Sequence, residues 1–317
     1  MNEIFTQIFT IATLAVILTK TAPLLLAALG GAFTQQGNIL NIGLEGMMLV
    51  GAFSAIAVGA VTNPFVGILG GIVAGVILSL IYALATLKYK ADFIVVGIGI
   101  NLFAAGLTVL LLTVLYGNPG VTPGNVKAIL PKISLGPLAN IPVLGPMLNQ
   151  QTILVWLAFL FVPVYAYILY RTPFGVHLRA VGEDESAAAA AGINVNRVKL
   201  TSILLSGVLC GIAGAQLSMA TVGSFAANMT ASRGFIAVAA LTFGLGRPYF
   251  TMIACLIFGA ADALADRLSL AGVNSSLALT TPYVITVIAI TLAALRVRSA
   301  YKARAKKVLE AAKTEVA

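Results

Sequence analysis

Residues 64–87 read PFVGILGGIVAGVILSLIYALATL, a run of 24 residues that contains no charged side chain. A helix needs about 20 apolar residues to cross the hydrocarbon core of a bilayer. Similar runs recur along the chain, and the candidate spans are 4–19, 21–35, 42–61, 64–87, 92–116, 152–170, 199–220, 233–246, 249–268 and 280–296. The sequence therefore predicts an all-α, polytopic membrane protein.

Three of these runs are short, namely 4–19, 21–35 and 233–246. They are expected to tilt, merge or re-enter, and Lys20 and Pro23 mark either a kink or a turn between the first two. The expectation is about 8–10 transmembrane helices, some of them short or broken.

Composition supports this fold class. Of the 317 residues 60% are hydrophobic and 9% are charged, and the mean hydropathy is +1.02. Soluble domains carry roughly a quarter charged residues, so a water-soluble enzyme is excluded. The two cysteines, Cys210 and Cys255, lie in apolar runs without metal-ligand spacing, and His177 is the one histidine. No metal site, disulfide framework or cofactor is expected.

Charged residues in the loops set the expected orientation. Lys88 and Lys90 separate two long apolar runs, and the loop 171–199 carries four basic residues, so both loops are expected in the cytoplasm. The loop 117–151 holds six of the twelve prolines and two lysines, which fits the outer face. Ten crossings would place both termini in the cytoplasm.

The C-terminus is strongly basic. Seven Lys/Arg residues and two acids lie between Arg296 and Ala317, which gives +5 of the total charge of +9. A basic segment directly after an apolar run indicates a cytoplasmic anchor near anionic lipid headgroups, whereas a nucleic-acid arm would be expected to interleave aromatic residues. We therefore expect a transmembrane domain over 1–298 and a basic cytoplasmic tail over 299–317.

Glycines recur every four residues at Gly67, Gly71 and Gly75, and again at Gly207 and Gly211. Small residues at this spacing let helix backbones approach closely in lipid, where van der Waals contact drives association. These five glycines are expected to pack helices against one another.

Ionisable residues inside apolar segments are candidates for function because they are costly in lipid. Glu45 lies in the polar, glycine-containing stretch Asn41–Gly46, which predicts a broken helix that is buried in protein or lines a water-filled cavity. Glu45 is either a pathway or gating residue, or an interfacial carboxylate that caps a helix or pairs with a basic residue. Arg233, which follows Asn228, could face a pore or mark the membrane interface.

The loop 171–199 contains Gly182, three acids, five alanines and Gly192. Acids suit the first turn of a helix, alanine favours the helix interior, and glycine suits the position after its end. We expect a short cytoplasmic helix of about two turns, with a small-residue surface that fits a groove of another protein. The chain has no phosphate-binding loop of the form G-x-x-x-x-G-K-[ST], so its energy source is an ion gradient or a partner protein.

Three stretches occur together in this order: Asn41-Ile42-Gly43-Leu44-Glu45-Gly46-Met47-Met48, the loop Leu178 to Val195, and Gly234-Phe235-Ile236-Ala237-Val238-Ala239-Ala240. Over roughly residues 20–296 the chain resembles the inner-membrane permease subunit of an ATP-binding-cassette (ABC) importer, in the branched-chain amino acid and simple-sugar permease family. The likeness is greatest to permeases of nucleoside or basic-membrane-lipoprotein importers.

The resemblance implies a multi-pass protein of the plasma (cytoplasmic) membrane that conducts solute and catalyses no reaction itself. The loop 171–199 would hold the coupling helix that docks on a cytoplasmic ABC ATPase, and the loop 117–151 would help receive an extracellular solute-binding lipoprotein. A second, non-identical permease subunit would complete the pore. The implied ATPase-coupling residues are Gly182, Glu183, Ala187, Ala188 and Gly192, and the candidates for the translocation path are Asn41, Glu45, Asn101, Asn228 and Arg233.

Several alternatives remain open from sequence. A simple-sugar permease shares the motifs, and a homodimer is an alternative to a heterodimer. An ion-coupled secondary transporter would carry carboxylates at mid-span, and the mid-span regions of the runs 64–87, 92–116, 152–170 and 199–220 hold none. An intramembrane enzyme acting on lipid would need an acidic or histidine cluster at an interface.

Overall fold

The computed structural model describes residues 11–134 and 148–270. In this part of the chain the elements are α2 (Ile11–Gln36), α3 (Leu44–Val61), α4 (Pro64–Ala83), the π-helix η1 (Leu84–Lys88), α5 (Phe93–Tyr116), β1 (Lys132–Ile133), β2 (Gln151–Thr152), α7 (Ile153–Arg171), α8 (Pro173–Glu183), α9 (Glu185–Ala190), α10 (Val195–Ala215), the π-helix η3 (Gln216–Val222), α11 (Arg233–Phe243) and α12 (Pro248–Leu270). The described residues up to 260 belong to one compact unit, and those from 261 onward to a second. The fold is all-α, as predicted.

Seven of the described helices are long and apolar enough to cross a membrane, and α11 is a shorter apolar helix. The predicted span 280–296, the basic tail 299–317 and residues 135–147 of the predicted outer loop lie outside the described residues. The chain is therefore a multi-pass membrane protein, as its hydropathy indicates.

The predicted runs 4–19 and 21–35 form one helix, α2, which continues through Pro23. Residues 24–29 are at most 1% exposed, because α2 packs against α7, α10 and α11. This burial holds the helix together across a proline that would weaken an isolated helix. Of the alternatives that the sequence leaves open for these two runs, the structure shows the merged helix.

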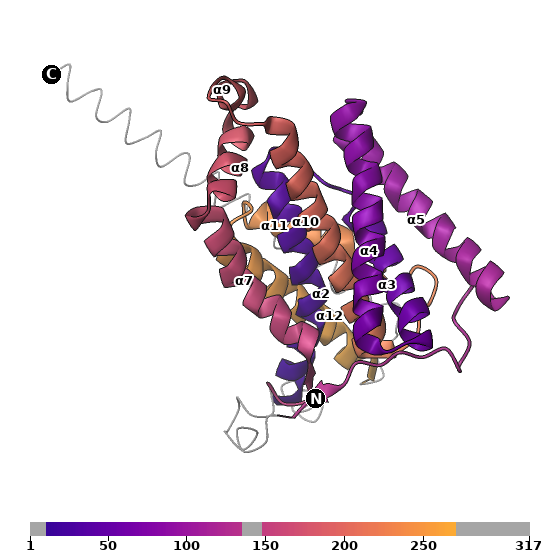
Figure 1. The fold of residues 1–317 in the computed structure, drawn as a ribbon. Helices are drawn as coiled ribbons and strands as arrows, with labels where there is room; N and C mark the ends of the chain where they lie inside the picture. Colours follow the sequence, from indigo (N-terminus) through magenta and orange to yellow (C-terminus); the bar gives the residue numbers. More distant parts are fainter. Residues whose placement is uncertain (1–10, 135–147, 271–317) are drawn as a thin grey trace. The chain divides into compact units, whose positions relative to one another are not determined.

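We name the two ends of the helix bundle by the elements found there, the β1–β2 end and the α8–α9 end. At the β1–β2 end, Gln151 donates to the carbonyl of Ala15 near the start of α2. At the α8–α9 end, the Gln36 amide at the end of α2 lies 3.4 Å from the carbonyl oxygen of Gly246, between α11 and α12. Helix α2 therefore runs from the β1–β2 end to the α8–α9 end, where α8 and α9 lie together in Figure 1. The N-terminal part of α2 therefore lies beside the predicted outer loop at Gln151, whereas the ten-crossing topology would start the first run on the cytoplasmic side.

The glycine prediction is confirmed. A side chain at Gly75 would collide with the backbone of Gly207, and one at Gly71 would lie 2.9 Å from the carbonyl oxygen of Gly51 and 3.1 Å from that of Gly211. A side chain at Gly67 would similarly meet the α3 backbone. The backbones of α3, α4 and α10 are thus in contact with one another. The polar stretch that starts at Asn41 and precedes α3 consequently lies beside α10.

Candidate translocation and coupling sites

The chain between α2 and α3 is not helical, and Asn41 organises it. The Asn41 side chain is 2% exposed, donates to Ser206 Oγ on α10 at 3.1 Å, and accepts from the backbone N–H of Gly43 at 2.9 Å. A buried polar group needs such partners because water cannot reach it. Asn41 therefore holds the predicted break against α10 inside the protein, rather than lining an open path in this structure.

Asn101 on α5 holds the other side of the same break. Its side-chain oxygen accepts from the Gly46 N–H at 2.8 Å, and its amide donates to the Ile42 carbonyl at 3.0 Å. Because Gly46 lies in the first turn of α3, Asn101 pairs one of the N–H groups that a helix start leaves free. The approach is close: a side chain at Gly46 would lie 2.8 Å from the carbonyl oxygen of Ile100.

Glu45 joins the start of α3 to the start of α11. Its carboxylate accepts hydrogen bonds from the backbone N–H of Ser232 at 2.9 Å and of Gly234 at 2.5 Å, and the residue is 7% exposed. A side chain at Gly234 would lie 2.5 Å from the backbone of Glu45, so glycine is required there. A carboxylate at a helix N-terminus also interacts favourably with the helix dipole. Of the two interpretations open from sequence, the structure shows the helix-capping contact.

Arg233 is the first residue of α11, and Asn228 precedes it in the segment that leads into this helix. The Arg233 guanidinium is 3.4 Å from the carbonyl oxygens of Met229 and Thr230, and the residue is half-buried. Asn228 is exposed, with a backbone φ of 57°. The structure thus brings Asn41, Glu45 and Asn101 together around one break, and it leaves Asn228 at the surface.

The segment 223–232 connects this break to the β1–β2 end. The Ala227 N–H donates to the Gly120 carbonyl at 2.7 Å, and the Thr122 N–H donates to the Phe225 carbonyl at 2.9 Å. The described part of the predicted outer loop is therefore bonded to the segment that leads directly into α11.

At the opposite end, Asp184 separates α8 from α9. Its carboxylate accepts from Ser186 Oγ at 2.7 Å and from the N–H groups of Ser186 and Ala187 at 2.8 and 3.0 Å. These bonds, with the Ser186 hydroxyl contributing most, hold the pKa of Asp184 below its usual value. The cap is therefore fully formed above the ordinary carboxyl pKa and is lost only as the pH falls through the lowered value.

The end of α9 confirms the predicted closing glycine. Gly192 has a φ of 83°, its N–H donates to the Ala189 carbonyl at 2.9 Å, and the Ile193 N–H donates to the Ala188 carbonyl at 3.0 Å. This pair of bonds is the Schellman arrangement, which favours glycine in the left-handed conformation. The short helix is present as predicted, although the three acids are divided: Glu183 ends α8, Asp184 caps α9 and only Glu185 lies in it.

The predicted coupling residues do not all face outward. Glu183, Ala187 and Gly192 are exposed, whereas Ala188 is 4% exposed and packs into the chain's own core. Gly182 lies against α2, where a side chain would collide with the Gln36 carbonyl. Gly182 and Ala188 thus position α8 and α9 against the rest of the chain. The other three predicted coupling residues are accessible to a partner.

The family described as branched-chain amino acid transport system, permease component, matches residues 13–294. The chain belongs to this family. The match includes every transmembrane helix that the structure describes apart from the first residues of α2. The break before α3 and the α8–α9 pair are therefore features of a transport permease.

Curated relatives cover most of the permease. It is 37% identical over 287 residues to the nucleoside ABC transporter permease protein NupC of Lactococcus lactis, covering 87% of this chain and 90% of the relative. It is 34% identical to the guanosine ABC transporter permease protein NupQ of Bacillus subtilis, with 86% and 89% covered. A putative glucose ABC transporter permease of Haloferax volcanii is 32% identical, with 87% and 89% covered.

Two features of the permease's α8–α9 end were not predicted from sequence. Lys199 on α10 is buried, forms an ion pair with Glu185 on α9, and lies 5.8 Å from the centre of the Phe93 ring on α5. A hollow of about 420 Å³ also lies beside α8, lined by Gln35, Gln36, Arg179, Gly182, Glu183 and Leu245. The position of Lys199 near the start of α10 indicates a charge at the membrane interface. Its pairing with Glu185, 14 positions earlier, could not be predicted because it depends on how the intervening loop folds.

Proposed function

We propose that this permease is a membrane subunit of an ABC importer for nucleosides, conducting substrate that a solute-binding protein delivers. The observation that carries this proposal is its identity of 34–37% to nucleoside and guanosine permeases over most of each chain. The sequence motifs that resemble nucleoside importers support the same substrate class. Transport, rather than catalysis, is the permease's own activity.

The exposed side of α9 is proposed to dock on a cytoplasmic ATPase that supplies the energy. Ala187 and Gly192 offer little side-chain bulk, and Glu183 lies beside the hollow that α8 lines. The ion pair of Glu185 with Lys199 connects α9 to α10. A displacement of α9 by the ATPase would therefore be transmitted to a transmembrane helix through this contact. The C-terminus is proposed to lie on this cytoplasmic side.

The translocation path is proposed to pass the break before α3. Glu45 and Asn101 fix the starts of α11 and α3, and movement of α11 would change the exposure of Arg233 and Asn228. The broad apolar surfaces of α4 and α5 are consistent with lipid and with a second, non-identical permease that completes the path.

Uptake by the complete transporter tests the substrate class. The permease is purified with its ATPase, second permease and solute-binding protein, reconstituted in liposomes containing ATP, and given radiolabelled guanosine. We expect ATP-dependent uptake that unlabelled nucleosides reduce and that glucose or ribose leaves unchanged. Competition by the sugars alone would instead support the simple-sugar importer, for which the 32% identity to a glucose permease is the specific observation.

Replacing Ala187 by arginine tests the docking surface. Because Ala187 is exposed, we expect a folded permease whose ATPase association and uptake fall at least about tenfold, a loss of about 1.4 kcal/mol in the interaction. The matched variant Ala188→Arg places a charge in the permease's core and is expected to lower its melting temperature in detergent instead. Normal ATPase binding by Ala187→Arg would contradict the docking assignment.

Cysteine labelling tests the orientation. Asn125 and Ser186 are both exposed, at the two opposite ends, while the native Cys210 and Cys255 are buried and give a low background. In intact cells we expect an impermeant thiol reagent to label Asn125→Cys and to leave Ser186→Cys unlabelled until the cells are opened. The reverse pattern would place α9 outside and remove the proposed ATPase contact.

A further inference from the structure

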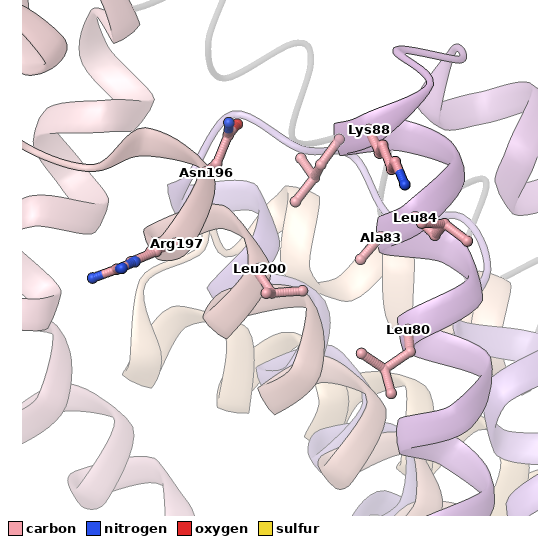
Figure 2. A pocket seen from close by; sticks show the side chains of 8 residues that line it. Leu80, Ala83, Leu84, Lys88, Asn196, Arg197 and Leu200 are labelled. Carbon is pink, nitrogen blue, oxygen red and sulfur yellow. The ribbon is translucent and has the colours of Figure 1, made fainter.

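A groove between α4–η1 and α10 has an apolar floor and basic residues at its rim. It has a volume of about 400 Å³ and is lined by Leu80, Ala83, Leu84, Leu87, Lys88, Asn196, Arg197 and Leu200. Figure 2 shows Leu80 and Ala83 on one wall facing Leu200 on the other. The amino group of Lys88 and the guanidinium of Arg197 point outward on opposite sides of the groove.

A polar hollow continues from this groove. It has a volume of about 400 Å³, shares Leu87 and Asn196 with the groove, and adds Lys90, Asp92, Glu185 and Lys199 among its lining residues. An apolar groove that opens into a polar hollow at the end of a transmembrane helix fits an amphipathic ligand. The volume of each lies within the range of small-molecule sites.

The free charge around these two cavities is positive. Both acids are engaged: Glu185 is paired with Lys199, and the Asp92 carboxylate caps α5 by accepting from the N–H groups of Ile94 and Val95. Lys88, Lys90 and Arg197 are exposed, and among the described residues none has an acidic partner within salt-bridge distance. These three side chains can therefore neutralise an anion that the described part of the chain does not supply.

We propose that this groove binds an anionic phospholipid, with an acyl chain between α4–η1 and α10 and the phosphate near Lys88 and Arg197. Lys88 ends a transmembrane span, so its ammonium lies at the depth of lipid headgroups while its hydrocarbon stem covers apolar surface. Basic clusters immediately beside a transmembrane helix attract anionic lipids. The π-helix η1 carries Leu84 and Lys88 into the groove wall, so the bound lipid would brace the α4–α5 connection beside α9.

Lipid retention measured by native mass spectrometry tests this site. The full-length permease is purified in detergent and exposed to equal amounts of phosphatidylglycerol and phosphatidylcholine. We expect preferential retention of phosphatidylglycerol and a loss of roughly thirtyfold in the double variant Lys88→Gln/Arg197→Gln, since each basic residue near an anionic headgroup contributes about fivefold. The control Lys127→Gln/Lys132→Gln removes two exposed lysines elsewhere in the chain and should retain the lipid normally.

A second variant separates the acyl chain from the headgroup. Leu200→Trp fills the groove and should reduce retention of both lipids, with the melting temperature showing that the permease remains folded. Unchanged phosphatidylglycerol retention in the Lys88/Arg197 variant, or an equal loss in the control, would overturn the proposal. Displacement by inorganic phosphate at the lipid's own concentration would assign the basic residues to a free anion. Loss of a co-purified second permease without loss of lipid would assign the groove to a subunit interface.

Discussion

Replacing Glu45 by leucine is expected to reduce uptake at least tenfold while the permease is still inserted in the membrane. The change leaves the N–H groups of Ser232 and Gly234 without their acceptor at the start of α11. A buried donor without a partner costs about 1–3 kcal/mol, so this junction loses roughly 2–6 kcal/mol before any relaxation. The measurement is ATP-driven nucleoside uptake at equal protein content, together with hydrogen exchange of the α11 amides.

Glu45→Gln is the matched control because it keeps the shape and one side-chain oxygen acceptor. If the carboxylate acts as a cap, glutamine can keep one of the two hydrogen bonds and should retain more α11 protection and more uptake than leucine. Equal inactivity of both variants with normal α11 protection would instead assign the negative charge itself to the transport path. The comparison therefore decides between the two interpretations that the sequence leaves open.

Replacing Gly211 by leucine is expected to destabilise the permease by about 3 kcal/mol or more and to reduce the amount of folded protein sharply. A side chain there would collide with the Gly71 carbonyl and lie 2.8 Å from the Ile72 Cα. Both obstacles are helix backbone, which cannot rotate away as a flexible side chain can. Thermal melting in detergent and the monodisperse yield measure this loss.

Gly106→Leu on α5 is the control for this substitution. Beyond the nearby backbone of α5 itself, no atom lies within 4 Å of a Cβ placed at Gly106, and leucine favours helix over glycine by up to about 1 kcal/mol. We expect unchanged or slightly raised thermal stability. A comparable loss in both variants would mean that glycine flexibility, rather than close packing of α4 and α10, sets the stability.

The sequence predicted the local features of the candidate sites well. The short helix α9 and its closing glycine follow from alanine, acidic and glycine preferences that act within a few residues. The polar break at Asn41 was also predictable, because helix-breaking glycines and amides occur beside a charge in an apolar run. Neither pattern indicated that Ala188 faces inward while Ala187 faces outward, since this depends on how α9 rotates against the rest of the chain.

The sequence by itself determined that the chain is a helical membrane protein, because long uncharged runs are stable in lipid only as helices that satisfy their own backbone hydrogen bonds. It also determined that Gly71, Gly75, Gly207 and Gly211 are packing positions. Tertiary structure alone decided that α2 runs unbroken through Pro23, because burial against three other helices outweighs the local cost of the proline. It alone decided the partners of Glu45, which lie 187 and 189 residues away at the start of α11. Contacts at such separations depend on how the helices pack, and no local preference of the residues encodes them.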